Sequence, residues 1–396
     1  MARTDYIGLR IARWRDIAGM TQQQLADAVG VTKAYISQIE NGRRPVEKRS
    51  LLGAFATALG VGVGDLTGQP EQPRNGDDMA IYSAVPGIRG ALDDDPDDPA
   101  DPGEVARRVD EAMRARMACD YPTLAKLLPG VLTGTRQLAN AGNEQGLPLF
   151  VRSAICAALA IKPFGHLDLA ARLAERAERA ASLLGQPVEQ AAAQFMLSQT
   201  ALSAATAGAR RRSLTVASEA AQRLGDDGDD NALTWYGLLH LQAALAAASL
   251  ARDADVTMHL GEADAAAARV QSDPWRMEFT PANCGVWRVG ASVENGEPEK
   301  APEYARRIDR STLKTANRLV RLHIDTGRGH YAAGDLAAAV RQFLAADEVS
   351  PMELRTRPSV RELVGQMVRD ARRRGSAELQ DLAIRCGVDP LSPDPS

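Results

Sequence analysis

The sequence predicts an all-α protein in which a small domain of five helices precedes a long α-solenoid. Residues 21–42 have the pattern of two short capped helices joined at Gly30. Beyond Glu104, amphipathic helical segments come in pairs whose central breaks recur at similar intervals. Aromatic residues make up only 4% of a chain that is 45% hydrophobic and rich in alanine, which favours helices packed closely through small side chains.

Length and charge distribution suggest several units with different partners. A chain of 396 residues is long enough for two or three domains. Its formal net charge is −4, but residues 1–68 carry nine basic and six acidic side chains, whereas residues 69–104 carry two basic and ten acidic ones. This distribution is expected if only the first domain approaches a polyanion.

The first two predicted helices begin and end with recognisable signals. The first helix spans residues 6–18 and ends at Gly19. Thr21 is a favoured N-cap for the second helix, and Gln24 can reach back to the backbone of the cap. Gly30 can take the left-handed conformation that ends this helix. We expect the inward face of the first helix to consist of Ile7, Ile11, Trp14 and Ile17.

The third predicted helix has two different faces. It is capped by Thr32, and Ile36 and Ile39 give it an apolar inner face. Spacings of three and four place small, amide and basic residues together on its outer face, namely Lys33, Ala34, Ser37, Gln38 and Asn41. Further helices over residues 50–59 and 63–66 supply a core that two helices cannot make alone.

Two capped helices joined by a short turn, with polar side chains outward on the second, form the helix-turn-helix arrangement that enters the DNA major groove. Residues 8–66 resemble the Cro/C1-type (XRE) family, whose lambda-repressor-like DNA-binding domain has five helices; we assign residues 1–67 to this domain. The resemblance covers about a sixth of the chain and rests on GLRIARWRDIAGMTQQQLA, GVTKAYISQIENGRRP and LLGAFATALGVGVGDL. Glycines, caps, apolar positions and the Glu-Asn-Gly run all keep the family spacing.

The resemblance implies a role for individual residues. The positions that would face base edges are Lys33, Ala34, Ser37 and Gln38; Gln pairs with adenine, Lys donates to guanine and Ala contacts the thymine methyl group. The positions that would hold backbone phosphates are Gln22, Thr32, Asn41, Arg43 and Arg44. Arg15 and Glu40 match an internal ion pair of the family. A solvated basic face is the alternative for Lys33 and Arg44.

Residues 68–103 read as an acidic linker. Proline, glycine and aspartate accumulate there, which opposes regular structure and keeps a segment extended and hydrated. An acidic DNA mimic or an activation tail is the alternative. The run MAIYSAVPGIRGAL is the one apolar patch in this segment, and it is a candidate to dock on a neighbouring domain.

Residues 104–390 are predicted to form a helical array. The breaks within its helix pairs are Gly165, Gly208, Asp253, Gly296 and Gly334, separated by 43, 45, 43 and 38 residues. Intervals of this size mark a helical solenoid. We expect five such pairs, with an opening pair at residues 104–141 and a closing pair at residues 358–386.

The last of these units resembles a tetratricopeptide (TPR) repeat. The small, aromatic and proline positions of that repeat are matched by Gly327, Ala339, Phe343, Ala346 and Pro351, while His330 replaces its usual tyrosine. An XRE domain, an acidic linker and a degenerate TPR array together resemble transcriptional regulators common in actinobacteria. Because one five-helix domain contacts only a few base pairs, we expect a homodimer that binds a near-palindromic operator in double-stranded DNA. The dispersed cysteines and the lack of a signal peptide predict a cytoplasmic location.

The first helices of the pairs should line a concave face, the usual binding surface of such arrays. We therefore expect a peptide or small-molecule effector to contact Trp235, Asn283, Trp287, Arg288, Asn317, Arg321 and His323. In TPR sensors related to quorum-sensing receptors, asparagines at such positions hold a peptide backbone. The alternative, in which the aromatic residues are core and the asparagines are solvated, stays open.

Other function classes have little support in the sequence. There is no phosphate-binding glycine loop after a strand, no HExxH and no GxSxG, so no catalytic residue and no enzymatic activity is predicted. The four cysteines show no metal-ligand spacing, and neither a metal nor a cofactor is expected. No signal peptide or membrane span is predicted. The competing hypothesis is an interaction adaptor that its helix-turn-helix merely tethers to DNA.

Overall fold

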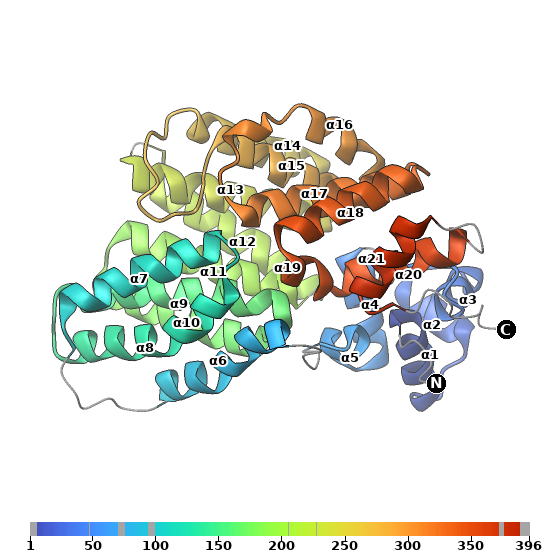
Figure 1. Ribbon diagram of the computed structural model, residues 1–396, viewed down its shortest axis with the longest axis horizontal. Coiled ribbons are helices and arrows are strands. Elements are labelled where there is room, and N and C mark those ends of the chain that lie inside the picture. Colours follow the sequence, from blue (N-terminus) through green and yellow to red (C-terminus); the bar gives the residue numbers. More distant parts are fainter. Residues whose placement is uncertain are drawn as a thin grey trace.

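The computed structural model describes residues 6–46, 48–69, 76–93, 100–204, 206–226, 228–371 and 376–388, and these residues contain helices but no strand (Figure 1). Five N-terminal helices form a compact unit, called the head below: α1 (Ile7–Ile17), α2 (Gln22–Val29), α3 (Lys33–Glu40), α4 (Arg49–Leu59) and α5 (Val63–Thr67). The remaining helices form a longer body. The predicted all-α fold with a five-helix N-terminal unit is therefore confirmed.

The predicted start and stop signals of the head helices are present. Thr21 and Gln24 form a reciprocal capping box, in which the Gln24 N–H donates to the Thr21 hydroxyl and the Thr21 N–H donates to the Gln24 side chain. Gly30 ends α2 with a φ of +77°, a conformation that favours glycine. Thr32 caps α3 by accepting from the Tyr35 N–H at 3.2 Å.

The prediction that Ile17 faces the core of the head is wrong. Ile7 and Ile11 are buried, but the side chain of Ile17 is 63% exposed. Ile17 lies six residues beyond Ile11, or about 1.7 helical turns, so it points away from the face that Ile11 buries. It is also the last residue of α1, beyond which the chain turns at Gly19.

The body, called the array below, consists of stacked helix pairs. It opens with α7 (Pro102–Met117) and α8 (Tyr121–Asn140) and closes with α20 (Pro358–Ala371) and α21 (Ala377–Arg385). Between them lie the five predicted pairs: α9 (Gly146–Ile161) with α10 (Leu167–Leu184), α11 (Pro187–Ser203) with α12 (Ala207–Leu224), α13 (Asp230–Ser249) with α14 (Asp253–Ala267), α15 (Pro281–Asn295) with α16 (Ala301–Arg306), and α17 (Ala316–Ala332) with α18 (Leu336–Val349). Short connecting helices are η1 (Lys162–Phe164), η2 (Pro298–Lys300), η3 (Arg310–Thr312) and α19 (Pro351–Arg355).

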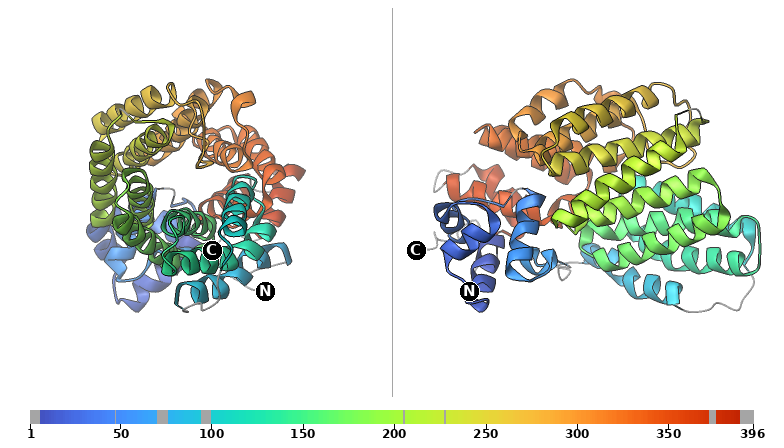
Figure 2. Two further views of the ribbon diagram at one scale, coloured as in Figure 1. Left: turned by 90° about the vertical axis from the view of Figure 1, so that its left-hand side faces the viewer. Right: turned by 180° about the vertical axis from the view of Figure 1, so that it is seen from behind.

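The array winds into a superhelix. Viewed along its length, the helices follow one another around a central space, and the head lies at one end beside α20 and α21 (Figures 1 and 2). Its core is rich in alanine, which lets neighbouring helices approach closely; Ala157, Ala174, Ala192 and Ala217, from the four successive helices α9 to α12, are fully buried. The low aromatic content of the sequence thus reflects small-residue packing.

The predicted linker contains a helix, which corrects the sequence-based interpretation. Residues Gly76–Asp93 form α6, which packs against α8. Ile81, Val85, Ile88 and Leu92 are buried at spacings of three and four, so the run MAIYSAVPGIRGAL is one apolar stripe of a helix. The surrounding aspartates and prolines obscured this periodicity. Residues 70–75 and 94–99, where those residues accumulate, lie outside the described residues.

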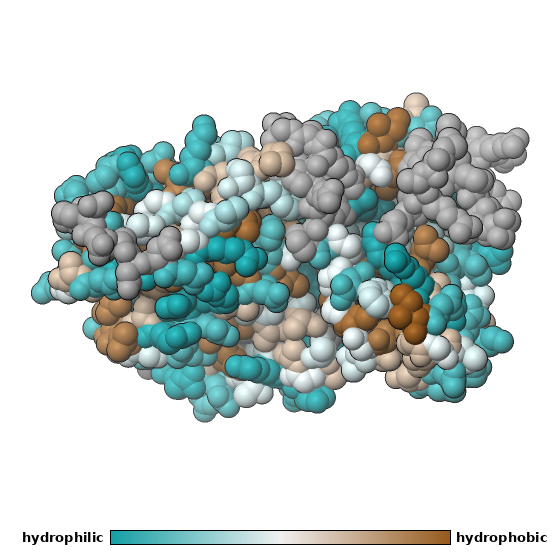
Figure 3. Space-filling model, turned by 90° about the horizontal axis from the view of Figure 1, so that it is seen from below, coloured by the Kyte–Doolittle hydropathy of each residue, from teal (hydrophilic) through white to brown (hydrophobic). Residues whose placement is uncertain are grey.

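Helix α9 and η1 together are long and apolar enough to cross a membrane by length and composition, but 61% of this segment is buried inside the protein. The underside of the molecule is mainly hydrophilic, and among its described residues the apolar ones form only small separate groups (Figure 3).

All four cysteines are free thiols, and burial raises the pKa of Cys119 to about 12, of Cys156 to about 11 and of Cys284 to about 12. These three thiols therefore stay protonated and unreactive.

Candidate functional site

The outer face of α3 is open to solvent. Lys33, Ala34 and Gln38 are exposed, and Ser37 is half-buried and accepts a hydrogen bond from the Asn41 side chain at 3.3 Å. We call these four residues, Lys33, Ala34, Ser37 and Gln38, the recognition face. The head therefore presents a polar helical surface that can enter a groove as a unit.

The predicted phosphate-binding residues differ in their exposure and in whether their polar groups are already bonded within the head. Thr32, Asn41, Arg43 and Arg44 are exposed, and the Arg44 guanidinium lies 4.6 Å from the centre of the Tyr35 ring. Gln22 is half-buried, and its amide donates to Glu40 at 2.8 Å. One N–H of Gln22 is thus used inside the head, and its phosphate contact remains a prediction.

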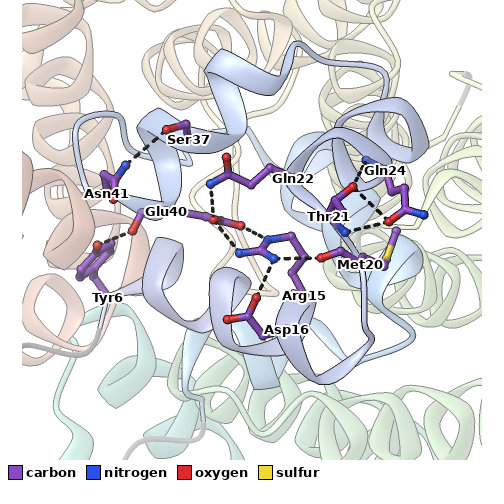
Figure 4. Close-up of polar contacts among 10 residues, drawn as sticks. All are labelled: Tyr6, Arg15, Asp16, Met20, Thr21, Gln22, Gln24, Ser37, Glu40 and Asn41. Atoms are coloured by element: carbon purple, nitrogen blue, oxygen red, sulfur yellow. Dashed lines mark hydrogen bonds and ion pairs between the residues drawn. The ribbon is translucent and has the colours of Figure 1, made fainter.

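An internal ion pair fixes α3 on the rest of the head (Figure 4). The Arg15 guanidinium donates twice to the Glu40 carboxylate, at 2.6 and 3.1 Å, and once to the Met20 carbonyl at 2.9 Å. Glu40 holds the pKa of Arg15 above its usual value. The ion pair implied by the family resemblance is therefore present, and it links α1 to the end of α3.

The head is docked on the array through polar contacts from several helices. The Ile7 N–H donates to the buried Glu362 carboxylate of α20 at 3.1 Å, and Arg49 pairs with Glu294 of α15 at 3.2 Å. The Gln69 amide donates to the Pro163 and Thr356 carbonyls at 3.3 and 3.2 Å. These contacts tie the head to both early and late helices of the array.

A cavity of about 330 Å³ occupies the space between the array and the head. The first helices of all five pairs contribute to it, as the sequence predicted for the concave face; these residues include Ala160, Phe195, Gln242, Trp287 and Arg318. The head closes one side with Ile7, Arg49, Leu52 and Gln69. A ligand in this cavity would contact helices of the array and the head at once.

The cavity is strongly cationic. Its lining contains seven basic residues, Lys48, Arg49, Arg116, Lys162, Arg318, Arg321 and Arg357, but a single acidic one, Glu353. Arg321 pairs with Asp325 at 2.6 Å, and Arg357 pairs with Glu353. Glu353 also accepts a hydrogen bond from the Tyr121 hydroxyl. These acidic partners leave several of the basic groups without a counter-ion.

The predicted effector residues are only partly brought together. Trp287, Asn317 and Arg321 line the cavity. The other four lie outside its lining, and their contact with an effector remains a prediction. Trp235 is fully buried against Phe195 and Trp275, Asn283 is buried and donates to the Glu278 carbonyl at 2.8 Å, Arg288 pairs with Asp264 at 2.6 Å, and His323 bonds Gln342 at 2.8 Å. In this structure their contacts are with neighbouring residues of the array.

A loop that the sequence did not single out also shapes the site. Residues 268–280 connect α14 to α15 and fold inward, so that Trp275, Met277 and Phe279 are buried. The ring of Phe279 fills the space beside Gly237 of α13, where a Cβ would lie 1.9 Å from the ring. Met277 reaches the cavity, and Arg276 pairs with Asp110 at 2.6 Å. The only sign of this inward fold in the sequence is that Trp275, Met277 and Phe279 stand among polar residues.

Comparison with known proteins supports the nature of the head. Residues 7–67 match the helix-turn-helix domain family, so the head is a Cro/C1-like helix-turn-helix domain. The solved structure of the apo form of the competence regulator ComR from Streptococcus vestibularis is similar over 89% of this chain and 95% of that chain, with 12% sequence identity and a TM-score of 0.36. None of the curated proteins matches.

Proposed function

We propose that this protein is a sequence-specific DNA-binding transcriptional regulator whose helical array senses an effector. The observation that carries the proposal is the exposed recognition face of α3, held by the Arg15–Glu40 ion pair within a helix-turn-helix domain. Such a face reads base edges, while the exposed Arg43 and Arg44 beside it suit backbone phosphates.

The position of the cavity supports the sensing part of the proposal. Arg49, Leu52 and Gln69 of the head and Trp287, Asn317 and Arg321 of the array border one volume. An effector that fits the cavity better in one head placement than in another shifts the equilibrium between the two placements by its difference in affinity. Its binding thereby changes how the head is presented to DNA.

A homodimer is part of this proposal, together with a near-palindromic operator and a cytoplasmic location. A single head contacts only a few base pairs, so useful affinity requires two heads about one helical turn apart. The array is the larger surface available for the dimer contact. Light scattering of the full chain with and without a cognate duplex measures the stoichiometry directly.

Selection of binding sites from a pool of random duplexes, with the full chain, tests the central claim. The proposal expects enrichment of one near-palindromic sequence with half-sites about one helical turn apart. A uniform preference for any duplex, with only a steep salt dependence, would instead favour the adaptor function.

A further inference from the structure

We propose that the cavity between array and head binds a small organic anion, that is, a carboxylate or phosphate group carried on an apolar body. The inference rests on the proposed function, because it names the effector class of the same site. It is carried by the excess of basic residues around the cavity and by buried donors that the protein itself leaves without acceptors.

Apart from the exposed Lys48, three of the basic residues have no acidic partner within ion-pair distance among the described residues: Arg116, Lys162 and Arg318. Arg116 is buried and donates to the Arg276 carbonyl at 2.9 Å, but its Nε has no partner. Arg318 donates only at 3.4 Å, to the Met277 carbonyl, and its Nε is also without a partner. Buried cations without counter-ions are costly, so an anion that accepts from them binds strongly.

The basic groups also repel one another. Burial, followed by the charges of Arg49, Arg321 and Arg357, lowers the pKa of Lys162 to about 7. Burial, followed by the charge of Arg116, lowers the pKa of Arg318 to about 10. Arg321 acts on both groups, so the positive charges form one connected field. A bound anion relieves this repulsion as well as supplying acceptors.

The rest of the lining sets the size and polarity of the ligand. Apolar side chains face the same volume, namely Phe195, Leu202, Leu245, Met277, Val286 and Trp287. The indole N–H of Trp287 is buried without a partner and adds a neutral donor. A volume of about 330 Å³ is near the lower end of the ~300–1,000 Å³ typical of small-molecule pockets. A compact aromatic or aliphatic acid therefore fits better than a peptide of several residues.

Matched probes test the charge requirement on the full chain. Calorimetric titration with naphthalene-2-carboxylate and naphthyl phosphate is compared with titration of the neutral naphthalene-2-carboxamide. We expect saturable binding of at least one anion, and binding of the amide at least about tenfold weaker. Arg318→Met should weaken anion binding at least about tenfold. In the control Arg223→Met, an exposed arginine of α12 is replaced and the affinity should not change.

The stability of unliganded Arg318→Met shows whether misfolding, rather than the lost charge, explains a loss of anion affinity. Because Arg318→Met removes a buried charge that has no counter-ion, the unliganded protein should melt at the same temperature as wild type or higher. Equal affinity for acid and amide, unchanged anion affinity in Arg318→Met, or no saturable binding of either anion up to about 10 mM would overturn the proposal. Binding of a short apolar peptide but of neither naphthyl anion would overturn it too.

A failure of anion binding can be distinguished from a failure of the proposed regulatory function. DNA affinity is measured in parallel on the selected operator. Anion binding that leaves DNA affinity unchanged supports this inference and contradicts the sensing function. Sequence-selective DNA binding without any anion binding contradicts this inference alone.

Discussion

The backbone N–H of Ile7, at the start of the head, donates to the carboxylate of Glu362, at 3.1 Å and across 355 residues of sequence. Glu362 lies on α20 and is buried, while the neighbouring Tyr6 ring lies 5.4 Å below the Arg369 guanidinium of the same helix. The first helix of the head is therefore anchored to the closing pair of the array. This anchor makes the head placement sensitive to the array.

Glu362→Gln should raise the melting temperature at neutral pH. Burial raises the pKa of Glu362 above its usual 4.5, so the folded protein holds this proton more tightly than the unfolded chain does. Its contribution to stability is therefore full below about pH 4.5 and declines as pH rises to the higher folded pKa. Thermal melts of both proteins across this range check the prediction. A difference that shrinks as pH rises would contradict it.

Gln38→Ala and Arg43→Ala should have different effects on DNA binding. Loss of a base contact by Gln38→Ala should cost about 1–3 kcal/mol on the selected operator and relax the preference at one base pair. Loss of a phosphate contact by Arg43→Ala should weaken binding to all sequences alike and reduce the salt slope by about one. Mobility-shift titrations on operator and random duplexes distinguish them. Equal losses on both duplexes from Gln38→Ala would exclude base reading by this residue.

Glu40→Ala should unfold the head selectively. Arg15 and Glu40 have side-chain exposures of only 13% and 6%, so removal of the carboxylate leaves a nearly buried cation and should cost about 3–5 kcal/mol. Hydrogen exchange should rise across residues 7–67 while the array stays protected. Asp16→Ala is the matched control, because Asp16 also pairs with Arg15 but is 70% exposed and should cost under about 1 kcal/mol.

Trp235→Ala should mainly reduce stability, whereas Asn317→Ala should mainly change ligand affinity. Trp235 is fully buried, so its truncation should destabilise the array by about 3–5 kcal/mol. Asn317 is half-buried on the cavity wall, and its truncation should leave stability within about 1 kcal/mol while changing ligand affinity. Chemical denaturation and calorimetric titration measure the two effects. A stable Trp235→Ala variant with impaired ligand binding would restore the original effector assignment.

Anion affinity should fall as pH rises through 7. Lys162, with its pKa lowered to about 7, is charged below this pH and neutral above it. The other charged groups that act on Lys162 are Arg49, Arg321, Arg357 and Glu353. Affinity for naphthalene-2-carboxylate, whose own charge is constant over this range, should therefore drop by up to about tenfold between pH 6 and 8. Lys162→Met should flatten the profile, and an unchanged slope in this variant would assign the effect to another group.

The head was predictable because its signals are local. Helix caps, left-handed glycines and apolar spacing act within a few residues, and apart from Ile17 they are found where the pattern placed them. The periodic breaks likewise predicted five helix pairs, because each pair must bury its apolar stripe against the next. Where composition was averaged over a longer segment, as around α6, the local stripe was missed.

Tertiary structure alone decided the cavity. Periodicity placed Trp235 and Asn283 on first helices but did not say whether those side chains faced the core or the axis of the superhelix. The turn between successive pairs, and the inward loop at residues 268–280, settled that choice. Arg116, Lys162 and Arg318 are far apart in sequence, and only the winding of the array brings their charges around one volume beside the head. The sequence thus determined the helices and the exposed polar face of α3, because these depend on contacts within a few turns, whereas the cavity depends on long-range packing.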